Sequence, residues 1–234
     1  MIGTFKALSA LLSYPSAELQ DAMDEIRAVL VDEAVLPPAR INAIEPLMQW
    51  LQTGDLYELR ETYVQLFDRS RTLSLNLFEH VHGDSRDRGG AMVNLLETYR
   101  TGGFDLVGPE LPDHLPVLLE FNATQPLEAA LEILADAGQI LAVLAERLTR
   151  RDTPYAAVLA GLAELAKGAV TDDVAAGLLA EPDDDPNDLA ALDAVWEEAQ
   201  VTFAPDPNAG CPVSRDILAK MDVPFSPARA GTAQ

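Results

Sequence analysis

The segment Ser16-Ala-Glu-Leu-Gln-Asp-Ala-Met-Asp-Glu-Ile-Arg-Ala-Val-Leu30 indicates how the whole chain folds. Its apolar residues Leu19, Met23, Ile26 and Leu30 recur three or four positions apart, which is the spacing of one face of an α-helix. Ser16 suits the N-terminus of that helix, because its hydroxyl can accept a hydrogen bond from a free backbone N–H. The segment therefore predicts an amphipathic helix.

The same periodicity recurs along most of the chain, with helix-starting residues such as Pro38 and Asp55 and no alternation typical of strands. Tight connections between short helices are typical of an all-α fold. We predict a single-domain helical bundle of about eight to eleven helices over residues 1–204. We expect residues 205–234, which are rich in Pro, Gly and Ala, to form a mobile tail. The helical ranges that we expect are 5–12, 16–30, 38–53, 56–67, 73–81, 84–101, 113–121, 126–150 and 154–168, with further helices from Thr171 and from Asp188.

Composition restricts the class of partner. The 38 Asp and Glu residues against 16 Lys and Arg give a formal net charge of −22, which argues against binding to nucleic acid or to an anionic membrane. A cationic or apolar partner fits better, although the acidic excess also serves solubility. The single cysteine, Cys211, excludes an internal disulfide. No secretory signal or membrane span is apparent, so we expect a cytoplasmic protein without direct membrane insertion.

Polar specialisation is concentrated in the run Leu77-Phe-Glu-His-Val-His-Gly-Asp-Ser-Arg-Asp-Arg-Gly89 and the residues that follow it. His80, His82 and His114 are all the histidines of the chain, and they could be read as ligands of a metal-dependent enzyme. Residues two apart on a helix point to opposite sides, and no H-E-x-x-H pattern is present. Polar histidines at a helix end are the simpler interpretation.

Two further groups could form a binding surface. On the expected helix 113–121, Asp113 and Glu120 share one face at positions i and i+7, and His114 and Leu118 lie on the adjoining stripe. These residues are a solvated helix face, or the wall of a pocket that attracts a cationic peptide. Arg86 and Arg88 are either local ion-pair residues or contacts for an acidic group.

The runs Ser74–Val93 and Glu110–Glu120 closely resemble the NarJ family, as do Leu11-Leu-Ser-Tyr-Pro15, Tyr63-Val-Gln-Leu-Phe-Asp-Arg69 and Ala191–Glu198. The members of this family are the molybdenum cofactor assembly chaperones of respiratory nitrate reductase, also called its delta subunit. They belong to the wider TorD/DmsD-like chaperone class. The resemblance covers roughly residues 5–203 in colinear order, which makes it far more specific than a short motif.

The resemblance implies an all-helical cytoplasmic chaperone with no catalytic activity and no cofactor of its own. Its partner would be the nitrate reductase catalytic (alpha) subunit, bound through the N-terminal segment of that subunit, and molybdenum cofactor biosynthesis proteins are further candidates. It would keep that subunit competent for cofactor insertion before membrane attachment. In the wider class the Pro-Asp-His element lies near the leader-binding groove, which places Pro112, Asp113 and His114 there.

A helix-in-groove mode of peptide recognition follows as a hypothesis. Phe67, Leu77, Phe78 and Leu118 would supply apolar contacts, Asp113 and Glu120 would attract positive charge, and His114 would set the hydrogen bonding. Exchanging Asp113 and His114 for alanine should then weaken leader binding without changing the melting curve. A separate hypothesis assigns His80, His82, Arg86 and Arg88 to other client contacts or to cofactor loading. A metal-dependent enzyme and a permanent structural subunit are the alternatives.

Overall fold

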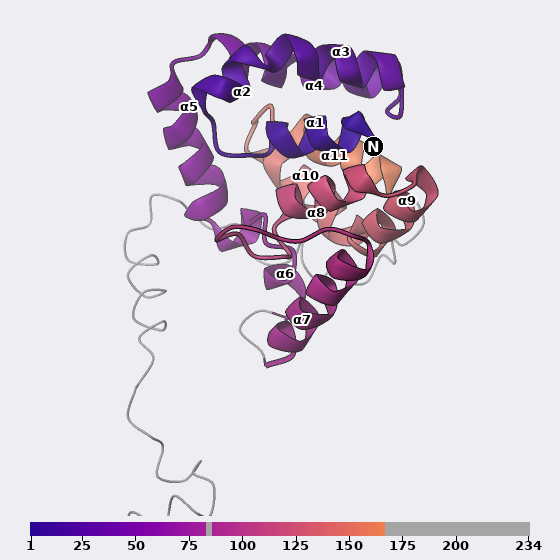
Figure 1. Ribbon diagram of the computed structural model, residues 1–234. Coiled ribbons are helices and arrows are strands. Elements are labelled where there is room, and N and C mark those ends of the chain that lie inside the picture. Colours follow the sequence, from indigo (N-terminus) through magenta and orange to yellow (C-terminus); the bar gives the residue numbers. More distant parts are fainter. Residues whose placement is uncertain (83–85, 167–234) are drawn as a thin grey trace, which may run out of the picture. The chain divides into compact units, whose positions relative to one another are not determined.

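Helices account for nearly all the regular structure in the computed structural model, which describes residues 1–82 and 86–166 (Figure 1). Both ranges fall within one compact unit, Met1–Asp188. The all-α prediction is confirmed for the described residues, which form no strand and only one isolated β-bridge. The expected helices from Thr171 and Asp188 and the expected tail lie outside the described residues. The helices are α1 (Gly3–Leu11), α2 (Ala17–Asp21), α3 (Met23–Glu33), α4 (Pro38–Thr53), α5 (Leu56–Tyr63), α6 (Glu79–His82), α7 (Arg86–Thr101), α8 (Leu115–Thr124), α9 (Leu127–Asp136), α10 (Gly138–Arg150) and α11 (Ala156–Leu165), with a π-helical turn at Val64–Asp68 and a 3₁₀ turn at Arg71–Leu73.

Local signals define several helix starts as expected. The Ser16 hydroxyl accepts a hydrogen bond from the Leu19 N–H, and the Asp55 carboxylate accepts from Tyr57 and Glu58. Pro38 is the first residue of α4. The end of α3 supplies the cap of α1, since the Glu33 carboxylate accepts from the N–H groups of Gly3 and Thr4 at 2.7 Å. This long-range cap holds α1 and α3 together.

Helix α1 lies between α3 and α8 and packs against both (Figure 1). Its residues Phe5, Leu8 and Leu11 have no exposed surface, and α10 and α11 pack side by side in the same core. Each fully buried leucine or phenylalanine contributes about 1.5–3 kcal/mol relative to an exposed one. The hydrophobic core is therefore organised around α1, α8, α10 and α11.

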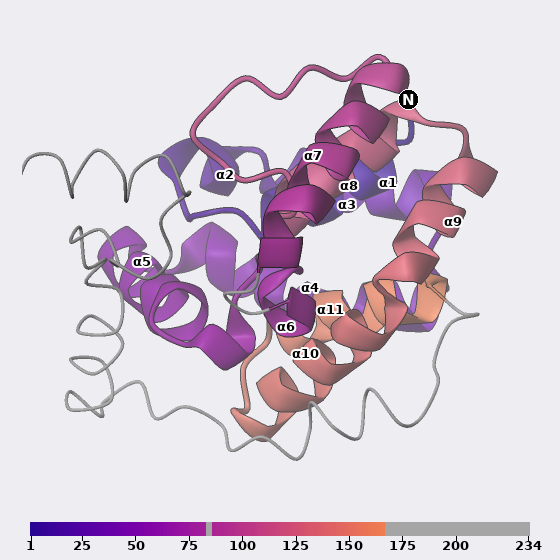
Figure 2. The same cartoon turned by 90° about the horizontal axis from the view of Figure 1, so that it is seen from below.

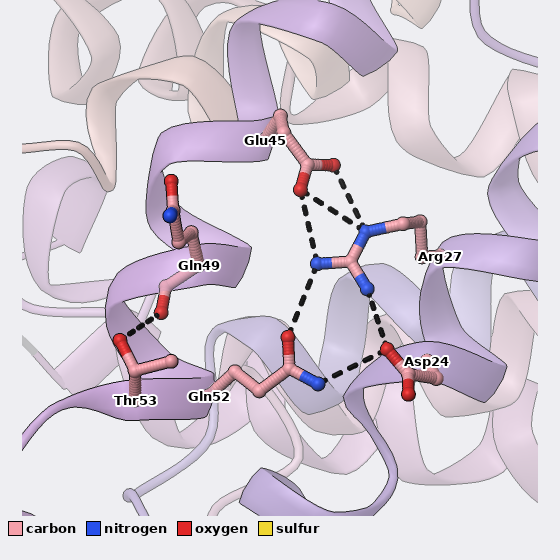
Figure 3. A network of polar contacts seen from close by, with 6 residues as sticks. All are labelled: Asp24, Arg27, Glu45, Gln49, Gln52 and Thr53. Carbon is pink, nitrogen blue, oxygen red and sulfur yellow. Dashed lines mark hydrogen bonds and ion pairs between the residues drawn. The ribbon is translucent and has the colours of Figure 1, made fainter.

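A polar network fixes α3 on α4 (Figure 3). The Arg27 guanidinium donates to both carboxylate oxygens of Glu45, to Asp24 and to the side chain of Gln52. A bidentate arginine–carboxylate pair sets orientation as well as distance. The α3 helix is thus held from α1 through Glu33 and from α4 through Arg27.

The expected helix over 126–150 is wrong in one respect, because it is two helices that meet at Ala137 and Gly138. A Cβ atom added at Gly138 would lie 3.2 Å from the Ala166 carbonyl oxygen. The backbone therefore approaches the end of α11 more closely than a larger residue allows. The heptad-like pattern of leucines continues through this junction and hides it from a periodicity analysis.

The expected helix over 73–81 is also wrong. After the turn at Arg71–Leu73 the chain is extended, and only Glu79–His82 form a helical turn. Residues 75–77 pair with residues 113–115 through backbone hydrogen bonds, which satisfy groups that a helix would have satisfied internally. None of the described helices is long and apolar enough to cross a membrane.

Candidate functional site

The candidate site is built on the short antiparallel bridge between Asn76 and His114. The Leu77 N–H donates to the Asp113 carbonyl at 3.0 Å, and the Leu115 N–H donates to the Leu75 carbonyl at 2.8 Å. These bonds join two segments that are far apart in the sequence. They also displace the start of α8 to Leu115, so that Asp113 lies outside the helix on which it was expected.

Asp113 is fully buried. Its Oδ2 accepts a hydrogen bond from the Phe78 N–H at 3.0 Å, while Oδ1 has no hydrogen-bond partner among the described residues. Burial raises the pKa of this carboxyl, and the Phe78 N–H and the nearby Arg88 charge oppose the shift. Asp113 and Glu120 therefore do not form a pair on one helix face, because Asp113 is internal and Glu120 is exposed.

Pro112 is held by a different element. The buried Tyr99 hydroxyl of α7 donates to the Pro112 carbonyl oxygen at 2.6 Å. Burial raises the pKa of Tyr99, with the Asp113 charge as a second cause, so this hydroxyl stays a donor. The bond and the Asp113 contacts fix the backbone on both sides of the bridge.

His114 is the residue of this element that reaches an open space. Its ring is half-buried, and Nδ1 lies 3.6 Å from a carboxylate oxygen of Glu110. Burial lowers the pKa of His114 and outweighs the opposing influence of Glu110, Asp113 and Asp68. The imidazole is consequently neutral near pH 7, and its contact with Glu110 is not a charged pair at that pH.

A cavity of about 580 Å³ opens beside His114. Its walls are Ser13 and Tyr14 after α1, the region of Tyr63 and Asp68, the loop 106–110 and one side of α8. The loop between α7 and α8, which contributes Leu106–Glu110 to these walls, extends well away from both helices before it returns to α8 (Figure 2). Because the cavity carries three carboxylates, those of Asp68, Glu110 and Glu120, we call it the acidic cavity.

Among the predicted site residues whose side chains the structure describes, two line the acidic cavity, His114 and Glu120. Sequence reasoning missed Asp68, Glu110 and Tyr14. All three lie in short runs that match the family pattern, and that membership was the available signal. Burial raises the pKa of Asp68, although the nearby His114 opposes this shift and Glu110 adds to it.

The predicted apolar contacts lie elsewhere. Phe67, Leu77 and Leu118 are 5%, 4% and 4% exposed and belong to the core, whereas Phe78 is half-buried. The Phe67 ring packs against Tyr63 and Tyr155, with centroids 4.9 and 5.1 Å apart. Peptide contact by these residues stays a prediction, and it would require a rearrangement of the core.

The second group of predicted site residues comprises His80, His82, Arg86 and Arg88. Its described side chains connect α6 with the elements around it. The His80 Nε2–H donates to the Ser74 carbonyl at 2.8 Å, and Arg88 pairs with Glu79 at 3.2 Å. The side chains of His82 and Arg86 lie outside the described residues. Within residues 1–82 and 86–166, no group of three or more His, Cys, Asp or Glu side chains is arranged to hold a metal ion.

Comparison with known proteins gives a consistent result. The family model described as nitrate reductase delta subunit matches residues 16–161. The Escherichia coli K12 protein named nitrate reductase molybdenum cofactor assembly chaperone NarJ is 43% identical over 205 residues, which cover 87% of this chain and 86% of that protein. A probable chaperone of the same description from that organism, NarW, is 37% identical over 207 residues, covering 88% of this chain and 86% of its own length. The probable NarJ of Bacillus subtilis 168 is 34% identical over 159 residues, covering 67% of this chain and 84% of its own.

Proposed function

Because this chain belongs to the nitrate reductase delta subunit family, we propose that it assists assembly of a nitrate reductase by binding the N-terminal segment of the catalytic subunit. The two Escherichia coli K12 relatives are named as assembly chaperones and not as catalysts, so the chain acts as a chaperone and not as an enzyme. Binding keeps the client open for molybdenum cofactor insertion and delays its membrane attachment. Proteins of cofactor biosynthesis are the further partners in this scheme.

The acidic cavity is the observation that carries the proposal. Three carboxylates and a neutral histidine surround a space whose other walls include Tyr14, Leu106 and Val117. Such a site favours a basic side chain with an apolar stem, because long cationic residues can bury their methylene groups while the charge meets a carboxylate. The excess of acidic residues in the whole chain also attracts a cationic segment from a distance.

Calorimetric titration with a synthetic peptide covering the client's N-terminal segment tests the proposal directly. We expect saturable one-to-one binding tighter than about 10 μM, which is about −7 kcal/mol. A peptide that fails to bind at every pH tested between about 5 and 8 would refute the proposed recognition.

Neutralising the cavity should weaken binding of this peptide. The double variant Glu110→Gln/Glu120→Gln should raise the Kd by about three- to tenfold, as expected for two partly exposed ion pairs. The control is Glu128→Gln/Glu132→Gln on α9, which makes the same change in net charge at exposed positions outside the cavity. Equal effects of the two double variants would mean that only overall charge matters, and the acidic cavity would lose its role.

Binding should also weaken on acidification. A bound cation favours neutral His114 and ionised Asp68, so binding releases protons and the Kd rises as the pH falls. The pKa of His114 is lowered and that of Asp68 is raised, so both groups gain protons on the acidic side of neutrality. Between about pH 7 and about pH 5 we expect a three- to tenfold loss of affinity by calorimetry. His114→Asn should reduce this dependence, and tighter binding at the lower pH would contradict the assignment.

A further inference from the structure

A second cavity, which we call the apolar trough, lies between α1 and the α2–α3 region and has a volume of about 530 Å³. Its apolar lining comes from Ala7, Ala10, Leu19, Ala22, Ile26 and Val29. Half of these residues are alanine, which leaves room for the side chains of a partner. None of the residues predicted from the sequence as apolar peptide contacts lines this trough within the described part of the chain.

The apolar trough and the acidic cavity meet. Ser13, Tyr14 and Glu120 line both, so one continuous surface runs from an apolar half to an acidic half. Five carboxylates line the combined surface, those of Glu18, Glu25, Asp68, Glu110 and Glu120. Lys6 is the one lysine or arginine among the described residues that line either half. The charge therefore selects a cationic occupant.

Tyr14 stands at the junction of the two halves and is 50% exposed. Its ring packs edge-on against Tyr63, with centroids 5.6 Å apart, and the Arg60 guanidinium lies 5.5 Å from its centroid. Arg60 is itself anchored, because its Nε donates to the Pro15 carbonyl at 2.9 Å. A large exposed aromatic ring whose position is already fixed loses little entropy on binding and is typical of an interaction hot spot.

The walls of the trough are also held in place before any partner binds. Glu33 joins α3 to the N-terminus of α1, and Arg27 joins α3 to α4 (Figure 3). A groove whose sides are fixed by long-range polar contacts binds without first paying for its own ordering.

We propose that the apolar trough and the acidic cavity form one two-part groove for a single amphipathic helix of the client. The apolar face of that helix lies in the trough against α1 and α3, its chain passes Tyr14, and a basic side chain enters the acidic cavity. This inference rests on the proposed function and deepens it, because it fixes the chemistry of the bound segment and places its apolar and basic parts in different halves of the groove. It also assigns the apolar half of recognition to α1–α3 and not to the core residues Phe67, Leu77 and Leu118.

A matched pair of substitutions tests the trough. Ala22→Glu places a carboxylate inside it, whereas Ala28→Glu places one on the exposed side of α3, outside both cavities. We expect Ala22→Glu to weaken binding of the client peptide at least about tenfold, because an apolar side chain would have to bury that charge. Ala28→Glu should leave binding unchanged or slightly tighter, since it only adds attraction for a cationic peptide. Thermal unfolding of both variants shows whether either one is damaged.

Double-mutant cycles test which half of the groove holds the basic residues of the peptide and which holds its apolar residues. Neutralising a basic residue of the peptide should be coupled to Glu120→Gln and not to Ala22→Glu. Replacing an apolar residue of the peptide with serine should be coupled to Ala22→Glu and not to Glu120→Gln. A nitroxide on the apolar part of the peptide gives a test on the unaltered protein, where it should broaden the amide signals of Ala10 and Ala22.

The outcomes separate the two levels of the proposal. Binding that is weakened by Glu110→Gln/Glu120→Gln but indifferent to Ala22→Glu, with no broadening at Ala10 and Ala22, would leave the acidic cavity in place and overturn the two-part groove. A peptide that does not bind the unaltered protein would overturn the groove together with the proposed function.

Discussion

Replacing Leu118 with alanine should lower the free energy of unfolding by about 2–5 kcal/mol. Leu118 is 4% exposed on α8, within the core that α8 shares with α1. Alanine loses the transfer free energy of the removed methyl groups and leaves a cavity that the surrounding helices fill only in part. Urea unfolding followed by circular dichroism measures the loss. Peptide affinity, expressed per folded molecule, should stay close to that of the unaltered protein.

Leu127→Ala is the matched control, because Leu127 is 43% exposed at the first position of α9. That change should alter the free energy of unfolding by no more than about 0.5 kcal/mol. The opposite pattern for Leu118→Ala, a loss of peptide binding at unchanged stability, would return Leu118 to the groove as the sequence suggested.

Local sequence signals were sufficient for much of the fold. Ser16 and Asp55 start helices because their side chains accept hydrogen bonds from free N–H groups of the first turn. Pro38 suits the first position of α4 because it has no N–H to leave unpaired there. None of these signals needs a distant partner. The all-α class followed from the helical spacing of apolar residues around these starts.

The expected helix over 16–30 is divided at Ala22 into α2 and α3. The two larger errors arose where a distant contact decides the conformation. Residues 73–81 have a helix-compatible pattern, yet their backbone groups pair with residues 113–115. The break at Gly138 depends on the nearness of Ala166 at the end of α11. A helical period within one segment contains no information about either neighbour.

The candidate site was predictable in part for the same reason. The family resemblance pointed to the Pro112–His114 element, and His114 does line the acidic cavity. Tyr14 and Asp68 were recognised only as members of runs that match the family, with no role of their own. Both reach the cavity only because α1, α5 and α8 converge there. This convergence depends on tertiary packing, which a local sequence pattern does not contain.

Replacing Asp113 with alanine should lower the free energy of unfolding by about 1–3 kcal/mol at neutral pH. The substitution removes the carboxylate oxygen that accepts from the Phe78 N–H, so this backbone N–H beside the bridge loses its hydrogen-bond partner. This expectation differs from the one based on sequence, which had Asp113 at the peptide surface and the melting curve unchanged. Asp113 acts on the site as a positioning residue, since its backbone and side chain both hold residues 77–78 against the segment that carries His114.

Asp113→Asn separates this positioning role from charge, because an amide oxygen can still accept from Phe78. Its loss of stability should be smaller than that of the alanine variant. Burial raises the pKa of Asp113, so in the unaltered protein this group contributes stability at acidic pH that is lost as the pH rises through the raised value. Relative to Asp113→Asn, the unaltered protein should therefore gain stability when the pH falls from neutrality toward the range of the shifted carboxyl. If Asp113→Ala left the free energy of unfolding unchanged but weakened peptide binding, Asp113 would instead be a direct contact. Removing a buried carboxylate that holds the backbone in place must lower the stability of the fold.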